Sequence, residues 1–155
     1  MPWLRDEAGA EGTIDYHRDD VAQRISELCP SGIDIFFDND GGPTLELALD
    51  RLRNGGRVVL RGATSRYAVD PPMPGPSNHL SLVMVNGRME GFLARNYLPR
   101  YPEAVAAMVP LLRSGRLKSK EDVAVGLRNA PDALARLYSG ANIGKQLLRM
   151  DDPPA

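Results

Sequence analysis

The chain has 155 residues, of which 43% are apolar and 25% charged, and its formal net charge is −1. This length suits one domain with a real core, and the composition is that of a globular protein rather than a disordered or fibrous one. The 19 Lys and Arg residues are scattered among 20 acids, which excludes nucleic acid as the main partner. No apolar run approaches the roughly 18 residues of a membrane span, and the N-terminus lacks the apolar segment of a signal peptide. We therefore expect a cytoplasmic protein that does not enter the membrane.

The cysteine and histidine residues offer no sign of metal or redox chemistry. Cys29 is the single cysteine, so no internal disulfide can form, and we interpret it as a packing residue. His17 and His79 stand alone, without Cys or carboxylate partners at the spacing of metal ligands. We expect no metal site.

The first half of the chain alternates short apolar runs with helical patterns, which predicts the α/β class with helices on the faces of a sheet. Two successive strand–helix units indicate parallel strands joined by right-handed crossovers. In chain order we expect the end of a helix over 1–8, a strand over 13–16, a helix carrying Val21, Ile25 and Leu28, a strand over 33–37, a helix carrying Leu45, Ala48, Leu49 and Leu52 that stops at 54–56, and a strand over 58–60.

The second half opens with a proline-rich stretch, 62–78, that predicts a long loop just after a strand end. Loops in this position are often functional. The pattern then predicts a helix over 78–85, a strand over 89–94, a helix carrying Val105, Met108, Val109 and Leu112 that ends at Gly115, a strand over 122–125, a helix through Leu134 and Leu137, a strand over 146–150 and a disordered tail over 151–155.

Candidate functional residues follow the predicted strands, because ligands of open α/β sheets bind outside the carboxyl ends of the strands. Residues 38–42 follow one strand and read Asp-Asn-Asp-Gly-Gly, while 61–67 follow the next and end in Tyr67, a possible donor to a reacting carbonyl. Both segments are also compatible with an ordinary capped turn, and Tyr67 with packing on the proline-rich stretch. Since no G-x-G-x-x-G follows a strand, the pattern alone indicates only an α/β domain with a possible site at the strand ends.

Six motifs together carry a family resemblance. They are Ile14-Asp15-Tyr16, Phe37-Asp38-Asn39-x-Gly41-Gly42, Asn54-Gly55-Gly56-Arg57-Val58, Gly62-Ala63-Thr64-Ser65-x-Tyr67, Arg88-Met89-Glu90-Gly91-Phe92 and Asn142-Ile143-Gly144-Lys145. In this order they resemble the prostaglandin reductase and 2-alkenal reductase family, within the zinc-free medium-chain dehydrogenase/reductase superfamily. The resemblance runs from about Trp3 to Met150 and covers only the latter half of a typical member.

The resemblance implies hydride transfer from NADPH to the β-carbon of an α,β-unsaturated ketone or aldehyde, without a metal. Tyr67 is the implied catalytic donor to the enolate oxygen. The resemblance further implies cofactor contacts from Tyr16 near the adenosine 2′-phosphate, from Asn39, from Gly62, Ala63, Thr64, Ser65 and Tyr67 beside the nicotinamide half, from Phe92, Leu93 and Ala94 along the nicotinamide, and from Asn142 in the last loop.

The resemblance also implies a partial Rossmann-like parallel sheet with helices on both faces. Residues 1–120 would be the C-terminal part of the NADP-binding domain, and 121–150 a return segment that packs on the substrate domain. The first strand-turn-helix, with its glycine-rich phosphate loop, and the N-terminal substrate domain would be missing, so the isolated chain is expected to be inactive. Asp40, where relatives usually carry an apolar residue, adds negative charge near an anionic ligand.

Two other interpretations stay open at this point. A non-catalytic interaction or dimerisation domain could pair its uncovered sheet edge with a second copy or with a complementing N-terminal chain. A methyltransferase-like fold could place Asp38 on a ribose, although the ordered set of motifs argues against it.

Overall fold

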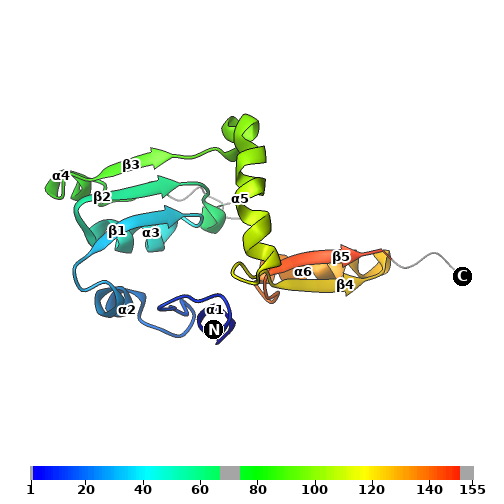
Figure 1. Ribbon diagram of the computed structural model, residues 1–155. Helices are drawn as coiled ribbons and strands as arrows, with labels where there is room; N and C mark the ends of the chain where they lie inside the picture. The colour runs from blue at the N-terminus through cyan, green and yellow to red at the C-terminus, as the bar shows by residue number, and fades with distance from the viewer. Residues whose placement is uncertain (1, 67–73, 151–155) are drawn as a thin grey trace, which may run out of the picture.

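The computed structural model describes residues 2–66 and 74–150. Within them, the first sheet consists of parallel strands β1 (Ile33–Asp38), β2 (Leu52–Leu60) and β3 (Arg88–Gly91), in that order. A second sheet pairs β4 (Glu121–Val125) with β5 (Lys145–Arg149), also in parallel. Figure 1 shows that the long helix α5 (Tyr101–Arg113) stands between the two sheets. The predicted α/β class with parallel strands is confirmed.

The remaining helices connect these strands. They are α1 (Pro2–Asp6), α2 (Val21–Leu28), α3 (Gly42–Asp50), α4 (Ser81–Met84) and α6 (Ala130–Ser139), together with the 3₁₀ helices η1 (Thr64–Arg66), η2 (Ala94–Arg100) and η3 (Leu127–Asn129). Helix α2 begins where the Asp20 carboxylate accepts a hydrogen bond from the Gln23 amide, 3.0 Å away. Helix α6 ends at Gly140, whose φ of 69° is the left-handed conformation that glycine adopts at low cost.

The core of the first sheet lies between α3 and β2. Leu45 and Leu49 of α3 pack with Leu52 and Val58 of β2. Partly buried side chains surround this cluster, namely Ile33, Phe36, Leu60, Leu82, Val85 and Met89. On the opposite face of β1, Ile35 and Phe37 are 64% and 52% exposed. One face of the sheet is therefore covered by α3, while apolar side chains of β1 on the other face meet solvent.

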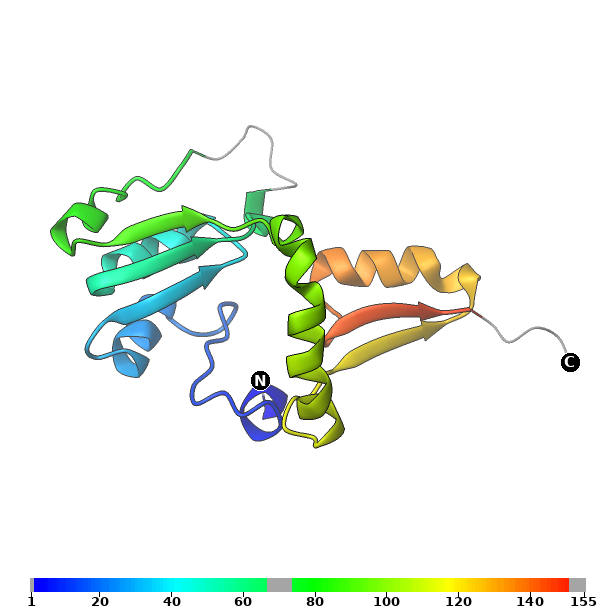
Figure 2. The same ribbon diagram turned by 45° about the horizontal axis from the view of Figure 1, so that its top comes forward.

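The second sheet is covered on one face by α6 (Figure 2). Arg136 of α6 contacts Asp122 of β4, with 2.7 Å between guanidinium nitrogen and carboxylate oxygen, and the Ile143 amide donates to the same oxygen. These two hydrogen bonds, from Arg136 first and Ile143 second, hold the pKa of Asp122 below its ordinary value. The other face of the sheet presents exposed Val123, Val125 and Leu147.

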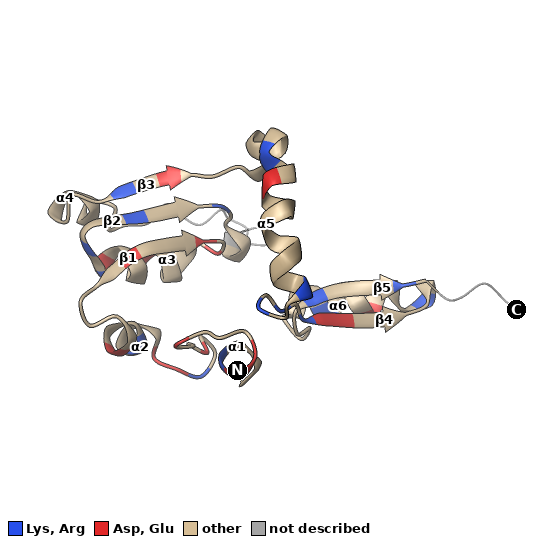
Figure 3. Ribbon diagram, viewed as in Figure 1, with Lys and Arg blue, Asp and Glu red and all other residues tan. Residues whose placement is uncertain are grey.

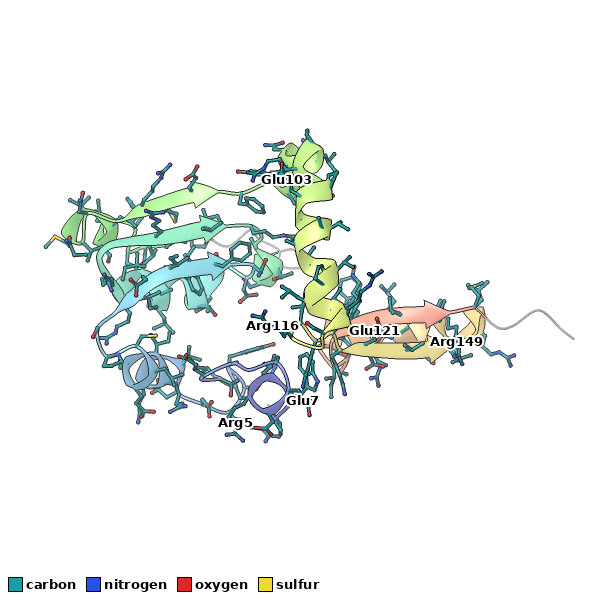
Figure 4. All side chains as sticks on the ribbon, in the orientation of Figure 1. Arg5, Glu7, Glu103, Arg116, Glu121 and Arg149 are labelled. Carbon is teal, nitrogen blue, oxygen red and sulfur yellow. The ribbon has the colours of Figure 1, made fainter. Side chains whose placement is uncertain are left out.

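One ion pair joins segments far apart in the sequence. Lys118, in the turn after α5, contacts Glu7 at a nitrogen–oxygen distance of 2.6 Å. Figure 4 labels Glu7 on the N-terminal segment and Arg116 on the turn after α5, so the two joined segments can be followed there. Exposed pairs of this kind contribute little to stability, about 0 to 1 kcal/mol, so Lys118–Glu7 joins the two segments without adding much to the free energy of unfolding.

The predicted strand over 13–16 is wrong. These residues form irregular backbone that ends in a turn at Tyr16. A strand is stable only when its backbone groups pair with a neighbour, and the edge of β1 has no partner in the described residues. The residues at 13–16 have an apolar–polar pattern but no neighbouring strand with which they could form backbone hydrogen bonds.

Leu52 belongs to a strand and not to the predicted helix. Helix α3 ends at Asp50, and β2 begins at Leu52, which pairs with Ile33. The register of β1 against β2 shifts between Ile33 and Ile35, because Ile33 pairs with Leu52 and Ile35 with Arg57. The Asn54-Gly55-Gly56 segment is therefore an irregular part within β2, and β2 does not begin after it. Leu52 is buried in the same cluster as Leu45 and Leu49, which is why it matched the helical spacing.

Several other boundaries move by a few residues. Helix α4 covers only 81–84 of the predicted 78–85, and β5 begins one residue earlier than expected. Strand β3 ends at Gly91, and the predicted last strand residue, Ala94, opens η2. The loop over 62–78 contains η1, and its residues 67–73 lie outside the described residues, as does the tail over 151–155.

Figure 3 shows Lys and Arg interspersed with Asp and Glu along both sheets. Among the described helices, none combines the length and the apolar character that crossing a bilayer requires.

Candidate functional site

Two turns meet at the carboxyl ends of β1 and β2. The Thr64 hydroxyl donates to the Asn39 carbonyl oxygen at 2.7 Å, and the Ser65 hydroxyl donates to the Asp40 carbonyl oxygen at 2.5 Å. The backbone amides of Arg61 and Gly62 both donate to the Asp38 carbonyl, at 2.8 and 3.2 Å. The structure thus brings together Asn39, Gly62, Thr64 and Ser65, four residues that the resemblance implied as cofactor contacts.

Asp38 shapes the first of these turns from within. Its side chain is 1% exposed, and Oδ1 accepts hydrogen bonds from the amides of Asp40 and Gly41, at 3.0 and 2.8 Å. Gly41 then takes φ 72° and ψ −152°, a conformation that favours glycine, and α3 begins at the next residue. The Asp38 carboxylate thus serves the turn itself, since its Oδ1 is occupied by two backbone amides of that turn.

A cleft of about 530 Å³ opens beside the two turns. Gly62 and Ala63 line it from the end of β2, and residues 74–76 form a proline-rich wall. Its other lining residues are Asp38, Gly41, Gly42, Pro43, Leu45, Glu46, Leu60, Arg61 and Met89. Apolar side chains with a few polar groups at the rim are typical of small-molecule sites.

A second groove, of about 790 Å³, runs between α2 and the free edge of β1. Tyr16 and Ser65 both line it, together with Ile14, Ile25 and Ile35. Tyr16 itself is 66% exposed, and its ring centroid lies 4.2 Å from that of His17. The predicted contact Tyr16 therefore shares a groove with Ser65 at the end of the sheet.

Phe92, Leu93 and Ala94 continue from β3 beside the end of β2. The Phe92 amide donates to the Leu60 carbonyl oxygen at 2.8 Å, which extends the pairing of the two strands. The Phe92 ring lies 6.2 Å from Phe37 and 5.1 Å from Tyr97, centroid to centroid. Aromatic contacts therefore hold this segment next to the end of β2, and its predicted contact with the nicotinamide stays a prediction.

Asn142 and Tyr67 stand apart from this cluster. Asn142 lies in the loop before β5, and its side-chain amide donates to the Gly144 carbonyl oxygen at 2.9 Å, so it belongs to the second sheet. Tyr67, the predicted catalytic residue, lies outside the described residues. The roles of all these residues as cofactor contacts remain predictions.

Two acids of α3 carry contacts that the sequence analysis did not single out. Glu46 accepts hydrogen bonds from Ser77, and Asp50 accepts from Asn78 and Ser81. The hydrogen bonds from the Ser77 amide and hydroxyl hold the pKa of Glu46 below its ordinary value. Acids four residues apart lie on one face of a helix, and this spacing is the signal that could have found them.

Histidine, cysteine and acidic side chains are spread over residues 2–66 and 74–150. Within this part of the chain, no three His, Cys, Asp or Glu side chains gather in a way that could hold a metal ion. The described residues therefore do not form a zinc site.

Characterised relatives extend over almost the whole chain. The 2-alkenal reductase (NADP(+)-dependent) of Nicotiana tabacum is 36% identical over 146 residues, which cover 94% of this chain and 42% of that protein. The (+)-pulegone reductase of Mentha piperita is 34% identical over 146 residues, with the same coverage of 94% and 42%. The chain thus spans less than half the length of these relatives.

Solved structures and a family model agree with these matches. The crystal structure of CurA from Vibrio vulnificus in complex with NADPH superposes with a TM-score of 0.84 at 30% identity, over 97% of this chain and 46% of that one. Residues 8–148 match the family described as zinc-binding dehydrogenase. Because that match takes in both sheets and the turns between β1, β2 and β3, the chain belongs to the zinc-binding dehydrogenase family.

Proposed function

We propose that the chain is the C-terminal part of an NADP-dependent oxidoreductase that reduces the C=C bond of α,β-unsaturated ketones or aldehydes. The observation that carries the proposal is the junction of the turns after β1 and β2, where Thr64 and Ser65 bond to the carbonyls of Asn39 and Asp40. The names of the tobacco and mint reductases support the substrate class, and the NADPH complex of CurA supports the cofactor.

The residues at the junction fit a nucleotide cofactor. Asn39 is exposed and offers a side-chain donor and a side-chain acceptor. The exposed Thr64 hydroxyl donates to the Asn39 carbonyl and can still accept a hydrogen bond. Gly42 leaves open the space next to Ser65: a Cβ there would lie 3.0 Å from the Ser65 hydroxyl oxygen. The residues that would hold NADPH are those named for it above, namely Tyr16, Asn39, Gly62, Ala63, Thr64, Ser65, Tyr67, Phe92, Leu93, Ala94 and Asn142.

NADPH, when bound, would supply a hydride to the β-carbon of the enone. Negative charge then develops on the carbonyl oxygen, and we assign Tyr67 the role of hydrogen-bond donor to that oxygen. A proton taken up from water at the α-carbon would complete the saturated carbonyl product. The aromatic segment at Phe92 would keep water away from the hydride path.

The second sheet has a separate role in this proposal. Parallel sheets are normally covered on both faces, whereas β4 and β5 present Val123, Val125 and Leu147 to solvent. We assign 1–120 to the NADP-binding domain and 121–150 to a return segment whose apolar face packs on the substrate domain.

A second candidate function is association through the first sheet. Strand β1 is an edge strand in the described residues, and its Ile35 and Phe37 side chains are more than half exposed. Edge strands with exposed apolar side chains readily pair with further chains. A homodimer, or a complementing N-terminal chain, would cover this edge.

A chimeric polypeptide tests the proposed function. The part of tobacco 2-alkenal reductase upstream of the match is joined to this chain. Oxidation of NADPH is followed with a 2-alkenal as the substrate. The control reaction is the oxidation of an alcohol by NADP⁺. We expect the chimera to bind NADPH and reduce the alkenal. The isolated 155 residues should bind NADPH weakly or undetectably and reduce nothing. A chimera that binds NADPH without reducing enones would show the proposed activity to be wrong. Reduction by the isolated chain would instead show that the upstream part is not needed for the reaction.

A further inference from the structure

Glu46, on α3, holds the chain where it returns from the proline-rich stretch. Its Oε1 accepts hydrogen bonds from the Ser77 amide at 2.7 Å and from the Ser77 hydroxyl at 2.9 Å. These hydrogen bonds connect residues 31 positions apart in the sequence. They lower the pKa of Glu46 against the repulsion of Asp50, so the acceptor is a charged carboxylate at neutral pH.

Asp50, one helical turn further along α3, holds the next part of the same segment. Its Oδ1 accepts hydrogen bonds from the Asn78 amide nitrogen at 2.6 Å and from the Ser81 hydroxyl at 3.1 Å. Asn78 also donates to the backbone carbonyl of Glu46 at 2.8 Å. Ser81 is the first residue of α4, so this second set of bonds fixes the start of that helix against α3.

The residues just before Ser77 form one wall of the cleft. Pro74, Gly75 and Pro76 line the cleft and belong to neither a helix nor a strand. Each proline ring fixes the backbone φ near −65°, which leaves few ways for the wall to move once Ser77 is held. The hydrogen bonds at Ser77 and Asn78 therefore fix one end of the wall, at the residue that follows Pro76.

We propose that Glu46 and Asp50 are positioning residues, which clamp residues 77–81 onto α3 and thereby set the position of the 74–76 wall facing the cleft of Gly62 and Ala63. The clamp itself follows from the contacts above. Its influence on reduction rests on the proposed function, because only there does the cleft serve a reaction.

Amide hydrogen exchange and NMR on the 155-residue chain test the clamp without any cofactor. In Glu46→Ala, the Ser77 amide should exchange about tenfold faster, the factor expected when one charge-assisted hydrogen bond is lost. Glu46→Gln keeps an acceptor oxygen and should restore most of the protection. The Gly75 resonance should shift in the double variant Glu46→Ala/Asp50→Ala, and stay near its original position in Glu46→Gln.

Two controls separate positioning from general destabilisation. The Phe92 amide, bonded to Leu60 between β2 and β3, should keep its exchange rate in every variant. Glu11→Ala removes an exposed acid from the N-terminal coil and should leave Ser77 and Gly75 unchanged. Unaltered Ser77 exchange in Glu46→Ala, an unmoved Gly75 resonance in the double variant, or faster exchange at Phe92 would each overturn the proposal. Because no readout uses NADPH, an inactive chimera leaves this result standing.

Discussion

The hydroxyl of Thr64 lies 2.7 Å from the carbonyl oxygen of Asn39 and donates a hydrogen bond to it, which ties the turn after β2 to the turn after β1. The Thr64 amide donates to the same oxygen at 3.2 Å. A single carbonyl thus holds both the backbone and the side chain of the neighbouring turn. In the part of the chain that the structure describes, the side chain of Asn39 makes no hydrogen bond, so it can meet a ligand.

Thr64→Val removes the hydroxyl and keeps the shape of the side chain. Because Thr64 is exposed, we expect a loss of about 0.5 to 1 kcal/mol in the free energy of unfolding, the lower part of the range for one hydrogen bond. Urea unfolding followed by circular dichroism measures it, with Thr13→Val, in the irregular N-terminal segment, as the control. A Thr64→Val chain as stable as the original would mean that the two turns are held without this bond.

Tyr67→Phe, in the chimeric enzyme, should lower turnover more than it weakens NADPH binding. The proposed hydroxyl stabilises charge that exists only in the transition state, and the loss of one such donor costs about 3 kcal/mol, or roughly a hundredfold in rate. Steady-state kinetics with an alkenal, varying each substrate in turn, separate the two effects. Unchanged turnover would remove Tyr67 from the mechanism.

Asn39→Ala and Asn142→Ala, in the same enzyme, should act mainly on the apparent affinity for NADPH. Asn39 stands at the junction of the two turns, and Asn142 is proposed to reach the cofactor from the loop before β5. Titration of NADPH by its fluorescence gives the affinity, and the turnover at saturating cofactor is the internal control. A fall in turnover with unchanged affinity would contradict the assignment.

The free edge of β1 should make the isolated chain associate. Ile35→Lys places a charge on an edge position that is 64% exposed, which natural sheets use to block edge pairing. Sedimentation velocity should show dimers or larger species for the original chain and more monomer for Ile35→Lys. Val83→Lys, at a 74% exposed position on α4, is the matched control. A folded original chain that stays monomeric at high concentration would sink the prediction.

Acid should weaken the second sheet through Asp122. Hydrogen bonds from Arg136 and Ile143 lower its folded-state pKa, so the unfolded chain binds more protons near that pKa. The resulting stability is fully present above the ordinary Asp value of 3.8 and is lost as the pH falls through the lowered value. Asp122→Asn should therefore lower the free energy of unfolding at neutral pH and lower it less at acidic pH. Urea unfolding at a series of pH values measures this difference. Glu121→Gln, on the same strand, is the control, and a pH-independent difference would contradict the linkage.

The strands that the sequence predicted best are those with a buried partner. The run at 33–37 and the run at 58–60 both lie in the first sheet, where apolar side chains such as Phe36 and Val58 pack against α3. The strand expected over 13–16 failed because a local pattern cannot tell whether a neighbouring strand exists. The prediction for Leu52 failed for a related reason. A buried apolar residue can belong to a helix or to a strand that packs in the same cluster, and the sequence pattern does not distinguish the two.

The candidate site was predicted in part. The rule that ligands bind at the carboxyl ends of parallel strands placed Asn39 and Thr64 together, and the structure joins them by a hydrogen bond. The clamp of Glu46 on Ser77 could not be predicted, because it connects a helix to the far end of an irregular stretch. Such contacts depend on the path of the irregular stretch back to α3, and hydrophobic periodicity carries no information about that path.

The two sheets have separate cores, and this division sets how the chain should melt. Four buried side chains of α3 and β2 form one core, whereas α6 contributes the single buried Ala133 to the other. Cooperativity needs shared packing, so heating should give two transitions, with 121–150 losing structure first.

The only tryptophan, Trp3, lies in α1 and belongs to neither core. Its fluorescence will follow the N-terminal segment, and a midpoint read from it describes neither sheet.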